Sequence, residues 1–217
     1  MPLTTRTSPD APTMDMQTAP PPRAVIFDLD GTLVDSRLDF AAIRREAAVP
    51  KGIGLLEYID ELACPQERQR VGAIVHQHEM AGARAATWMP GAEQALHGLC
   101  ARGLPIGIVT RNSREAASLT IARLSMPAMP LKAREDAPPK PDPTALLALA
   151  EEWRLPPADI AFVGDFHYDT EAARRAGMLP VLFTNGSKPA LDTEGLFTLL
   201  AFDLLLPWVD GHPHSAR

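Results

Sequence analysis

The sequence predicts an α/β fold, a doubly wound parallel sheet of the Rossmann-like type with a small α-helical cap inserted after the first strand. Stretches with helical spacing of apolar residues alternate with short apolar runs, at residues 24–27, 104–110, 160–164 and 179–184. This alternation is typical of βαβ units. The region 35–89, by contrast, keeps a helical pattern throughout, and proline and glycine divide it into three or so short helices.

Composition divides the chain into three parts. Residues 1–22 hold six prolines and lack apolar periodicity, which predicts a disordered tail. The α/β core is expected at 23–34 together with 90–217, and the helical cap at 35–89.

Local signals predict each later element. Gly103 closes a helix over 92–102, and Gly177 ends the helix after the fourth strand. The remaining expectations are a helix over 112–124 with Asn112 and Glu115 at capping-box spacing, a weak strand over 131–134, a helix from Asp142 as N-cap to about Trp153, and a closing segment over 196–206 that fits either a helix or a short helix and strand.

Composition also excludes several classes of protein. A net charge of −6 argues against a nucleic-acid binder but allows a small anionic substrate. No apolar run reaches the roughly 18 residues of a membrane span, and the first residues lack the apolar region of a secretory signal. Two cysteines give no disulfide framework. A cytoplasmic protein with no membrane or protein partner is expected.

Two carboxylates follow the first predicted strand. Asp28 and Asp30 stand at i and i+2, so both side chains leave the strand tip in one direction. Two like charges this close repel, and a cation such as oxygen-ligated Mg²⁺ relieves the repulsion. Gly31 then allows a tight turn that brings the backbone close to a bound group. Simple loop capping is the alternative, and the residues that follow argue against it.

Three further groups of polar residues come after later strands. Thr110 ends the second strand, and Arg111-Asn112 leads to a helix N-terminus, where a hydroxyl and free N–H groups suit an anion. Lys140 stands between prolines in a stiff turn, and Asp165 and Asp169 follow the fourth strand. Because ligands of such sheets bind at the carboxyl ends of the strands, these residues are expected to form one site.

This set of residues suits phosphoryl transfer. Hard oxygen ligands for Mg²⁺, a lysine and a helix N-terminus can clamp the charge of a transferring phosphoryl group. The sequence has neither a G-x-x-x-x-G-K-[ST] loop nor a G-x-S-x-G elbow, which argues against a nucleotide-dependent kinase and an acyl hydrolase.

From Ala24 to Thr184 the chain resembles the haloacid dehalogenase-like hydrolase superfamily, in its phosphatase branch. The resemblance rests on D-x-D-G-T-L-V-D-S at 28–36, on Thr110, on Lys140-Pro141 and on Gly164-Asp165 with Asp169. The position of the cap is similar to that in phosphoglycolate phosphatases. The dehalogenases lack an acid at the place of Asp30, so its presence favours phosphate chemistry.

The resemblance implies a role for each residue. Asp28 is the expected nucleophile, Asp30 the general acid and base, and Thr110 and Lys140 bind the phosphoryl group. Gly31, Arg111 and Asn112 are expected at the substrate. Mg²⁺ is expected on the Asp28 and Asp165 carboxylates and the Asp30 backbone carbonyl, with Asp169 beside them, holding a metal-bound water or Lys140.

Some interpretations stay open. Arg111 either touches substrate or pairs with a surface acid, and the cap residues Arg37, Arg44, Arg45 and Lys51 either form a solvated face or reach the substrate. The predicted function is a Mg²⁺-dependent phosphatase (a phosphoric monoester hydrolase) of a small phosphoglycolate-like or sugar-phosphate-like metabolite. The alternatives are a phosphomutase, a phosphometabolite-binding protein without activity and, less consistent with the helical insert, a signalling receiver domain.

Overall fold

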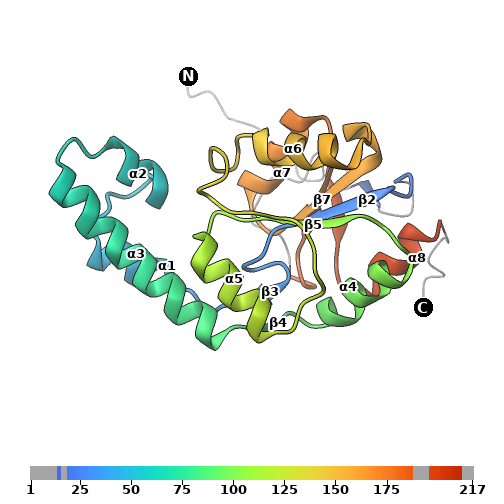
Figure 1. Cartoon of the computed structure of the whole chain (residues 1–217), viewed down its shortest axis with the longest axis horizontal. Helices are drawn as coiled ribbons and strands as arrows, with labels where there is room; N and C mark the ends of the chain where they lie inside the picture. Colours follow the sequence, from blue (N-terminus) through green and yellow to red (C-terminus); the bar gives the residue numbers. More distant parts are fainter. Residues whose placement is uncertain (1–13, 16–18, 188–195, 212–217) are drawn as a thin grey trace, which may run out of the picture.

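The computed structural model describes residues 14–15, 19–187 and 196–211 (Figure 1). Within these residues seven strands form one parallel sheet, in the order β1-β9-β8-β7-β2-β5-β6. These strands are β1 (Met14–Asp15), β2 (Ala24–Phe27), β5 (Ile106–Val109), β6 (Leu131–Lys132), β7 (Ile160–Gly164), β8 (Leu179–Phe183) and β9 (Phe197–Leu199).

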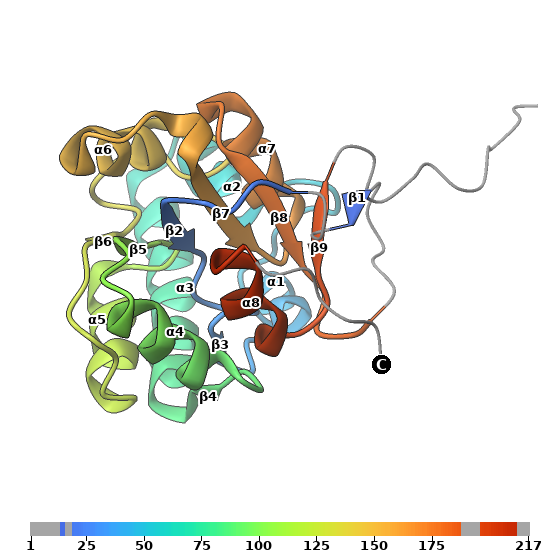
Figure 2. The ribbon, with the colours of Figure 1, turned by 90° about the vertical axis from the view of Figure 1, so that its right-hand side faces the viewer.

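Helices cover both faces of this sheet (Figure 2). On one face, Val25 and Phe27 pack with α4 (Ala92–Ala101), α5 (Arg114–Arg123) and α8 (Leu205–Val209). On the other, Ala24 and Ile26 pack with α6 (Thr144–Trp153) and α7 (His167–Ala176). Successive residues of β2 therefore point to opposite layers, as the pleat requires. The predicted doubly wound α/β fold is confirmed.

A helical cap interrupts the chain after β2 and stands at the left of Figure 1. It contains α1 (Phe40–Glu46), α2 (Leu55–Glu61) and α3 (Pro65–Ala85). A two-stranded antiparallel ribbon, β3 (Val34–Asp35) with β4 (Thr87–Trp88), connects it to the core. The predicted cap insertion is confirmed, and its exact boundaries at 35 and 89 stay a prediction. Instead of a short third helix, α3 has 21 residues; a glycine inside a helix costs only about 1 kcal/mol, so neither Gly72 nor Gly82 ends it.

The prediction that residues 1–22 are disordered is wrong for the part that the structure describes. β1 pairs with β9 in parallel. Ala19 is buried, and its carbonyl oxygen accepts a hydrogen bond of 3.2 Å from Trp208 Nε1. A two-residue strand has no periodicity to detect, and its partner comes from the other end of the chain. Residues 1–13 and 16–18 lie outside the described residues.

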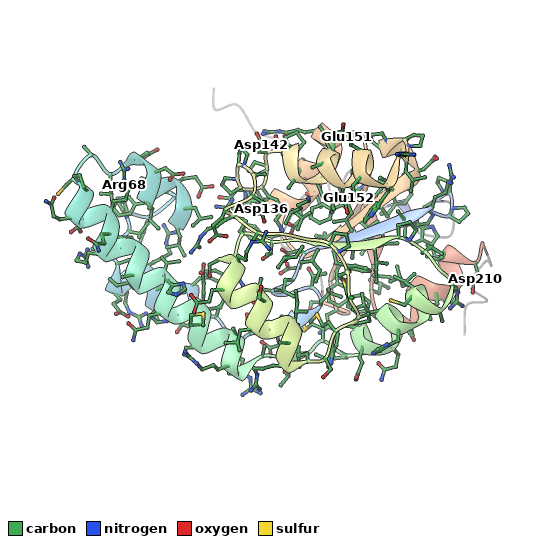
Figure 3. All side chains as sticks on the ribbon, viewed as in Figure 1. Arg68, Asp136, Asp142, Glu151, Glu152 and Asp210 are labelled. Atoms are coloured by element: carbon green, nitrogen blue, oxygen red, sulfur yellow. The ribbon has the colours of Figure 1, made fainter. Side chains whose placement is uncertain are left out.

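Two helices begin one residue later than predicted. The N-cap of α5 is Ser113, whose hydroxyl accepts from Ala116 N, so the assignment of this role to Asn112 is wrong. The N-cap of α6 is Pro143. Asp142, labelled in Figure 3, lies one position earlier and accepts from Thr144 N at 2.9 Å.

The open question at residues 196–206 has a clear answer. Phe197–Leu199 extends the sheet as β9, and α8 follows after one turn of 3₁₀-helix at Phe202–Leu204. Gly103 and Gly177 end α4 and α7 with φ of +69° and +71°, which confirms both predicted helix ends.

Candidate active site

The site lies where the central strands of the sheet end. β2 is flanked by β5 on one side and by β7 on the other, so the residues after these three strands meet at one edge. Asp28, Asp30, Thr110 and Asp165 come from these strand ends and line a cavity of about 620 Å³ between core and cap. The structure therefore brings together residues that the sequence places far apart.

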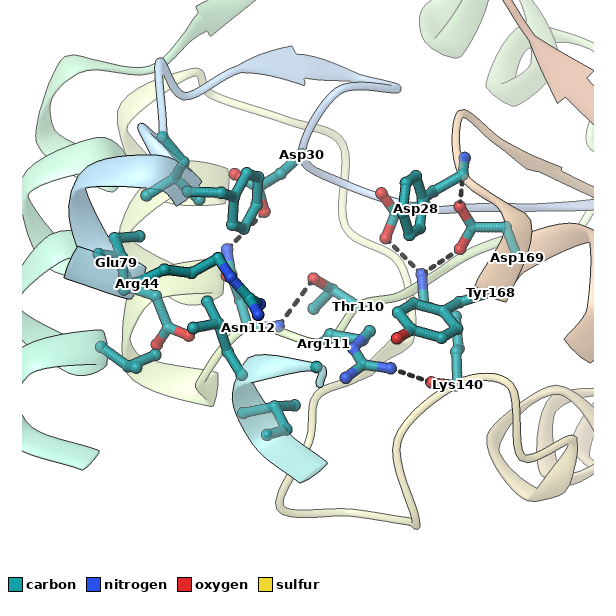
Figure 4. Close-up of a pocket in the computed structure, with 18 of the residues that line it drawn as sticks. Asp28, Asp30, Arg44, Glu79, Thr110, Arg111, Asn112, Lys140, Tyr168 and Asp169 are labelled. Atoms are coloured by element: carbon teal, nitrogen blue, oxygen red, sulfur yellow. Dashed lines mark hydrogen bonds and ion pairs between the residues drawn. The ribbon is translucent and has the colours of Figure 1, made fainter. Parts of the chain in front are cut away.

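Lys140 holds the centre of this site (Figure 4). Its side chain is 3% exposed, and its ammonium contacts Asp28 Oδ1 at 2.5 Å and Asp169 Oδ1 at 2.6 Å. A third bond, of 3.0 Å, goes to the carbonyl oxygen of Val109. All three ammonium protons thus have acceptors. Lys140 lies in the loop before α6, and its charge neutralises two carboxylates, one directly after β2 and one in the first turn of α7.

Burial shifts the proton affinities of this group. It raises the pKa of Asp28 well above its usual range; Lys140 opposes that shift, and the nearby charges of Asp169 and Asp165 add to it. Burial also raises the pKa of Asp165 to about 6, with the Asp169 charge contributing. Burial alone would lower the pKa of Lys140, but the two carboxylates beside it raise it. The lysine is therefore a fixed positive charge.

The turn after β2 depends on glycine. Gly31 has φ of +85°, and a Cβ there would lie 2.3 Å from Asp165 Oδ2. Thr32 Oγ1 donates a bond of 3.3 Å to Asp165 Oδ1. The missing side chain of Gly31 therefore lets the Asp165 carboxylate lie directly against the turn.

Asp30 lies apart from the lysine, toward the cap. Asn112 Nδ2 donates to its Oδ2 at 2.5 Å, and the backbone N–H of Asn112 donates to Thr110 Oγ1 at 3.1 Å. Burial raises the pKa of Asp30 to about 6; a hydrogen bond from Ser36 opposes the shift, and the charge of Glu79 adds to it. A carboxyl group with this pKa can both give and take a proton near neutral pH.

Arg111 connects the site to the cap. Its Nη2 bonds to both carboxylate oxygens of Glu57, at 2.7 and 2.9 Å, and Nη1 donates to the carbonyl oxygen of Lys140. Its guanidinium lies 4.2 Å from the ring centroid of Tyr168. It pairs with an acid as one interpretation had it, and it also lines the cavity.

Sequence reasoning missed three residues here: Glu57, Glu79 and Tyr168. Glu79 is buried on α3 and accepts from Arg134 Nη1 at 2.6 Å. No local pattern distinguishes these residues from solvated helix positions, because their partners come from the core. Of the four basic cap residues considered from the sequence, Arg44 and Lys51 line the cavity.

Three carboxylates could hold a metal ion. Asp28, Asp165 and Asp169 each offer an oxygen, and these atoms lie within 4.8 Å of one another. Such hard oxygen donors fit Mg²⁺. Both Asp169 oxygens have protein partners, Lys140 and the backbone N–H of Phe166. The assignment of the ligands to Asp28, Asp165 and the Asp30 carbonyl stays a prediction.

The fold and the site together define a class of protein, a capped, doubly wound α/β enzyme with an aspartate-rich centre. A model of the haloacid dehalogenase-like hydrolase family matches residues 22–177. The chain belongs to this family.

Individual relatives support this family assignment. The chain is 31% identical over 172 residues to a haloacid dehalogenase-like hydrolase domain-containing protein of Arabidopsis thaliana, covering 74% of this chain and 70% of that one. It is 31% identical over 178 residues to a phosphoglycolate phosphatase of Xylella fastidiosa, covering 72% and 78%. A solved structure of a Pseudomonas syringae hydrolase superposes with a TM-score of 0.71 at 25% identity, covering 88% and 98%. The prediction of an enzyme, a phosphoric monoester hydrolase, is confirmed.

None of the helices in the described ranges combines the length and the apolar character needed to cross a membrane.

Proposed function

We propose that this protein is a Mg²⁺-dependent phosphatase that hydrolyses a small phosphorylated metabolite through an aspartyl-phosphate. One observation carries the proposal: the Lys140 ammonium lies 2.5 Å from Asp28 at the floor of the cavity. A buried cation at this point opposes the rise in the pKa of Asp28 that burial causes, which favours the ionised nucleophile, and its charge stabilises an incoming phosphoryl group.

In the first step an Asp28 oxygen attacks phosphorus, and the bond from phosphorus to the ester oxygen breaks. Asp30, with its raised pKa, gives its proton to the departing oxygen. Thr110 hydrogen-bonds an equatorial oxygen, and the charge of Lys140 stabilises the phosphoryl group. In the second step Asp30 takes a proton from water, which attacks the same phosphorus and releases inorganic phosphate and free Asp28.

Two features of the chain orient this chemistry. The bond from Asn112 to Asp30 keeps the acid facing the cavity. Gly31 leaves space for the Asp165 carboxylate beside the nucleophile. When bound by Asp28, Asp165 and the Asp30 carbonyl, Mg²⁺ supplies a charge clamp and a template for the phosphoryl oxygens.

The first experiment measures phosphate release from a panel of metabolite phosphates and an aryl phosphate, with Mg²⁺ and with a chelator. Release that needs Mg²⁺ and that Asp28→Asn abolishes supports the proposal. Asp159→Asn is the matched control, since its carboxylate pairs with Arg23 at the surface. Transfer to a second sugar hydroxyl instead of water identifies a phosphomutase. Tight binding of phosphate esters without release identifies a binding protein.

A reducing compartment such as the cytoplasm is part of the same proposal. Both cysteines, Cys64 and Cys100, are free thiols in the structure, and stable disulfides are rare in that compartment.

A further inference from the structure

The cavity extends from the phosphoryl site well into the cap. Its floor, at the strand ends, carries the charged groups described above. Its cap side is mostly apolar, with side chains from the segment before α1, from α1 itself, from the loop before α2, from α2 and from α3: Leu38, Phe40, Ile43, Ile53, Leu56 and Val75. The site therefore has one polar end and one apolar end.

The folded chain leaves much of this apolar surface uncovered. Leu38, Phe40, Ile53 and Leu56 belong to none of the three hydrophobic clusters of the described residues. Phe40 is 56% exposed. No residue of α2 is buried. Because exposed apolar surface gathered around one cavity is typical of a ligand site, these side chains are suited to packing on a ligand.

The core contributes an aromatic group to the same cavity. Phe166 is 47% exposed, and its ring centroid lies 5.3 Å from that of Tyr168. Both residues line the cavity. Among the described residues two large apolar side chains with comparable exposure, Leu147 and Leu200, do not line it. Phe40 from the cap and Phe166 from the core thus offer aromatic surface to one ligand.

Of the charged groups that line the cap half, Glu79 and Arg111 form ion pairs within the protein, and Lys51 forms none with a described residue. Glu79 pairs with Arg134, and Arg111 pairs with Glu57. Arg44 donates to the carbonyl oxygen of Pro50. A short acidic leaving group would contact few of these charged groups. It would also leave the apolar walls of the cavity in water, so that binding would gain no free energy from burying them.

The size of the cavity supports the same conclusion. About 620 Å³ falls within the roughly 300–1,000 Å³ of sites that enclose drug-sized ligands. A phosphoryl group with a two-carbon acid would occupy only the polar end.

We propose that the leaving group of the substrate is an apolar, ring-bearing body that fills the cap half of this cavity and packs on Phe40, Leu56 and Phe166. This inference rests on the proposed phosphatase function. It narrows the substrate to phosphomonoesters of alcohols with an apolar ring, and it departs from the expectation of a phosphoglycolate-like or sugar-phosphate-like substrate.

The test compares propyl phosphate with 3-phenylpropyl phosphate. Both release a primary alcohol, so a difference in kcat/KM reports contacts with the ring and not the acidity of the leaving group. We expect 3-phenylpropyl phosphate to exceed propyl phosphate by at least about tenfold, since a buried ring gains both area and aromatic contacts. Phosphoglycolate is expected to fall below 3-phenylpropyl phosphate.

Variants locate the contact. Phe40→Ala and Leu56→Ala should each raise KM for 3-phenylpropyl phosphate by at least about threefold, and the change in KM for propyl phosphate should be smaller, because the propyl chain lacks the ring. Both residues are partly exposed, so truncation should leave the fold intact, and melting temperatures check this. Leu147→Ala, whose exposed side chain does not line the cavity, is the matched control and should change kcat/KM for neither substrate.

Three results would overturn the inference: equal kcat/KM for the two alkyl phosphates, a preference for phosphoglycolate over both, or unchanged KM in both cap variants. If no phosphomonoester is hydrolysed, the proposed function fails separately. Calorimetry with 3-phenylpropylphosphonate and propylphosphonate then decides the apolar site. Binding at least about tenfold tighter for the phenyl compound supports it, and equal binding refutes it.

Discussion

Replacing Lys140 by methionine tests whether its charge holds the site together. Methionine has similar length and no charge, so the change leaves Asp28 and Asp169 buried without their cation. Breaking a buried ion pair by removing one partner costs about 3–5 kcal/mol. The cavity beside these groups admits water, so the lower end of that range is expected. For a domain of this size a loss of about 3 kcal/mol should lower the melting temperature by about 6–12 °C.

The assay is urea and thermal unfolding in excess chelator, so that no bound metal compensates for the lost charge. Lys132→Met is the matched control. Its ammonium lies 3.6 Å from Glu152, which is half exposed and labelled in Figure 3. A surface pair of this kind contributes about 0–1 kcal/mol. A loss in Lys140→Met no larger than that in the control would refute the argument.

A double variant tests whether the stability lost in Lys140→Met comes from unpaired carboxylates and not from lost packing. Lys140→Met combined with Asp169→Asn removes one of the uncompensated carboxylates, so the double variant should be more stable than Lys140→Met alone. If the losses of unfolding free energy in Lys140→Met and Asp169→Asn simply add in the double variant, the two side chains do not interact.

Three further predictions concern the backbone and the cap. Gly31→Ala should lower kcat/KM at least about tenfold with the fold retained, because its Cβ would lie 2.3 Å from an Asp165 oxygen; Gly103→Ala has positive φ but open space and should leave kcat/KM unchanged. Ser113→Ala should cost about 1 kcal/mol in urea unfolding, since the N-cap of α5 is lost, and no loss would contradict this cap. Glu57→Gln should leave the melting temperature within about 4 °C, because its ion pair with Arg111 is partly exposed. It should nevertheless speed amide hydrogen exchange in α2, and unchanged exchange would argue that this ion pair does not tether the cap to the core.

The sequence alone predicted much of the fold and the candidate site, because the relevant signals are local. A buried run followed by Asp28 and Asp30 reports a strand and its end within a few residues. Gly103 and Gly177 mark helix ends through their own backbone angles. Such patterns depend on spacings of two to four residues, which are visible in the sequence itself.

The predictions that were wrong or missing concern contacts between residues far apart in the sequence. Nothing near Met14 shows that it pairs with a strand that begins at Phe197. Asn112 and Ser113 both cap helices well, and only the position of Asp30 directs the Asn112 side chain away from the helix. In the sequence Glu57 cannot be told from an exposed glutamate, because its partner Arg111 belongs to the core.

The sequence by itself determined which chemical groups stand at the ends of the strands, and in what order. The tertiary structure alone decided which of them touch. Lys140 and Asp28 are 112 residues apart in the chain, and their contact exists because parallel strands end at one edge of the sheet. The apolar half of the cavity likewise exists only after the cap folds over the core, since distant segments contribute each wall.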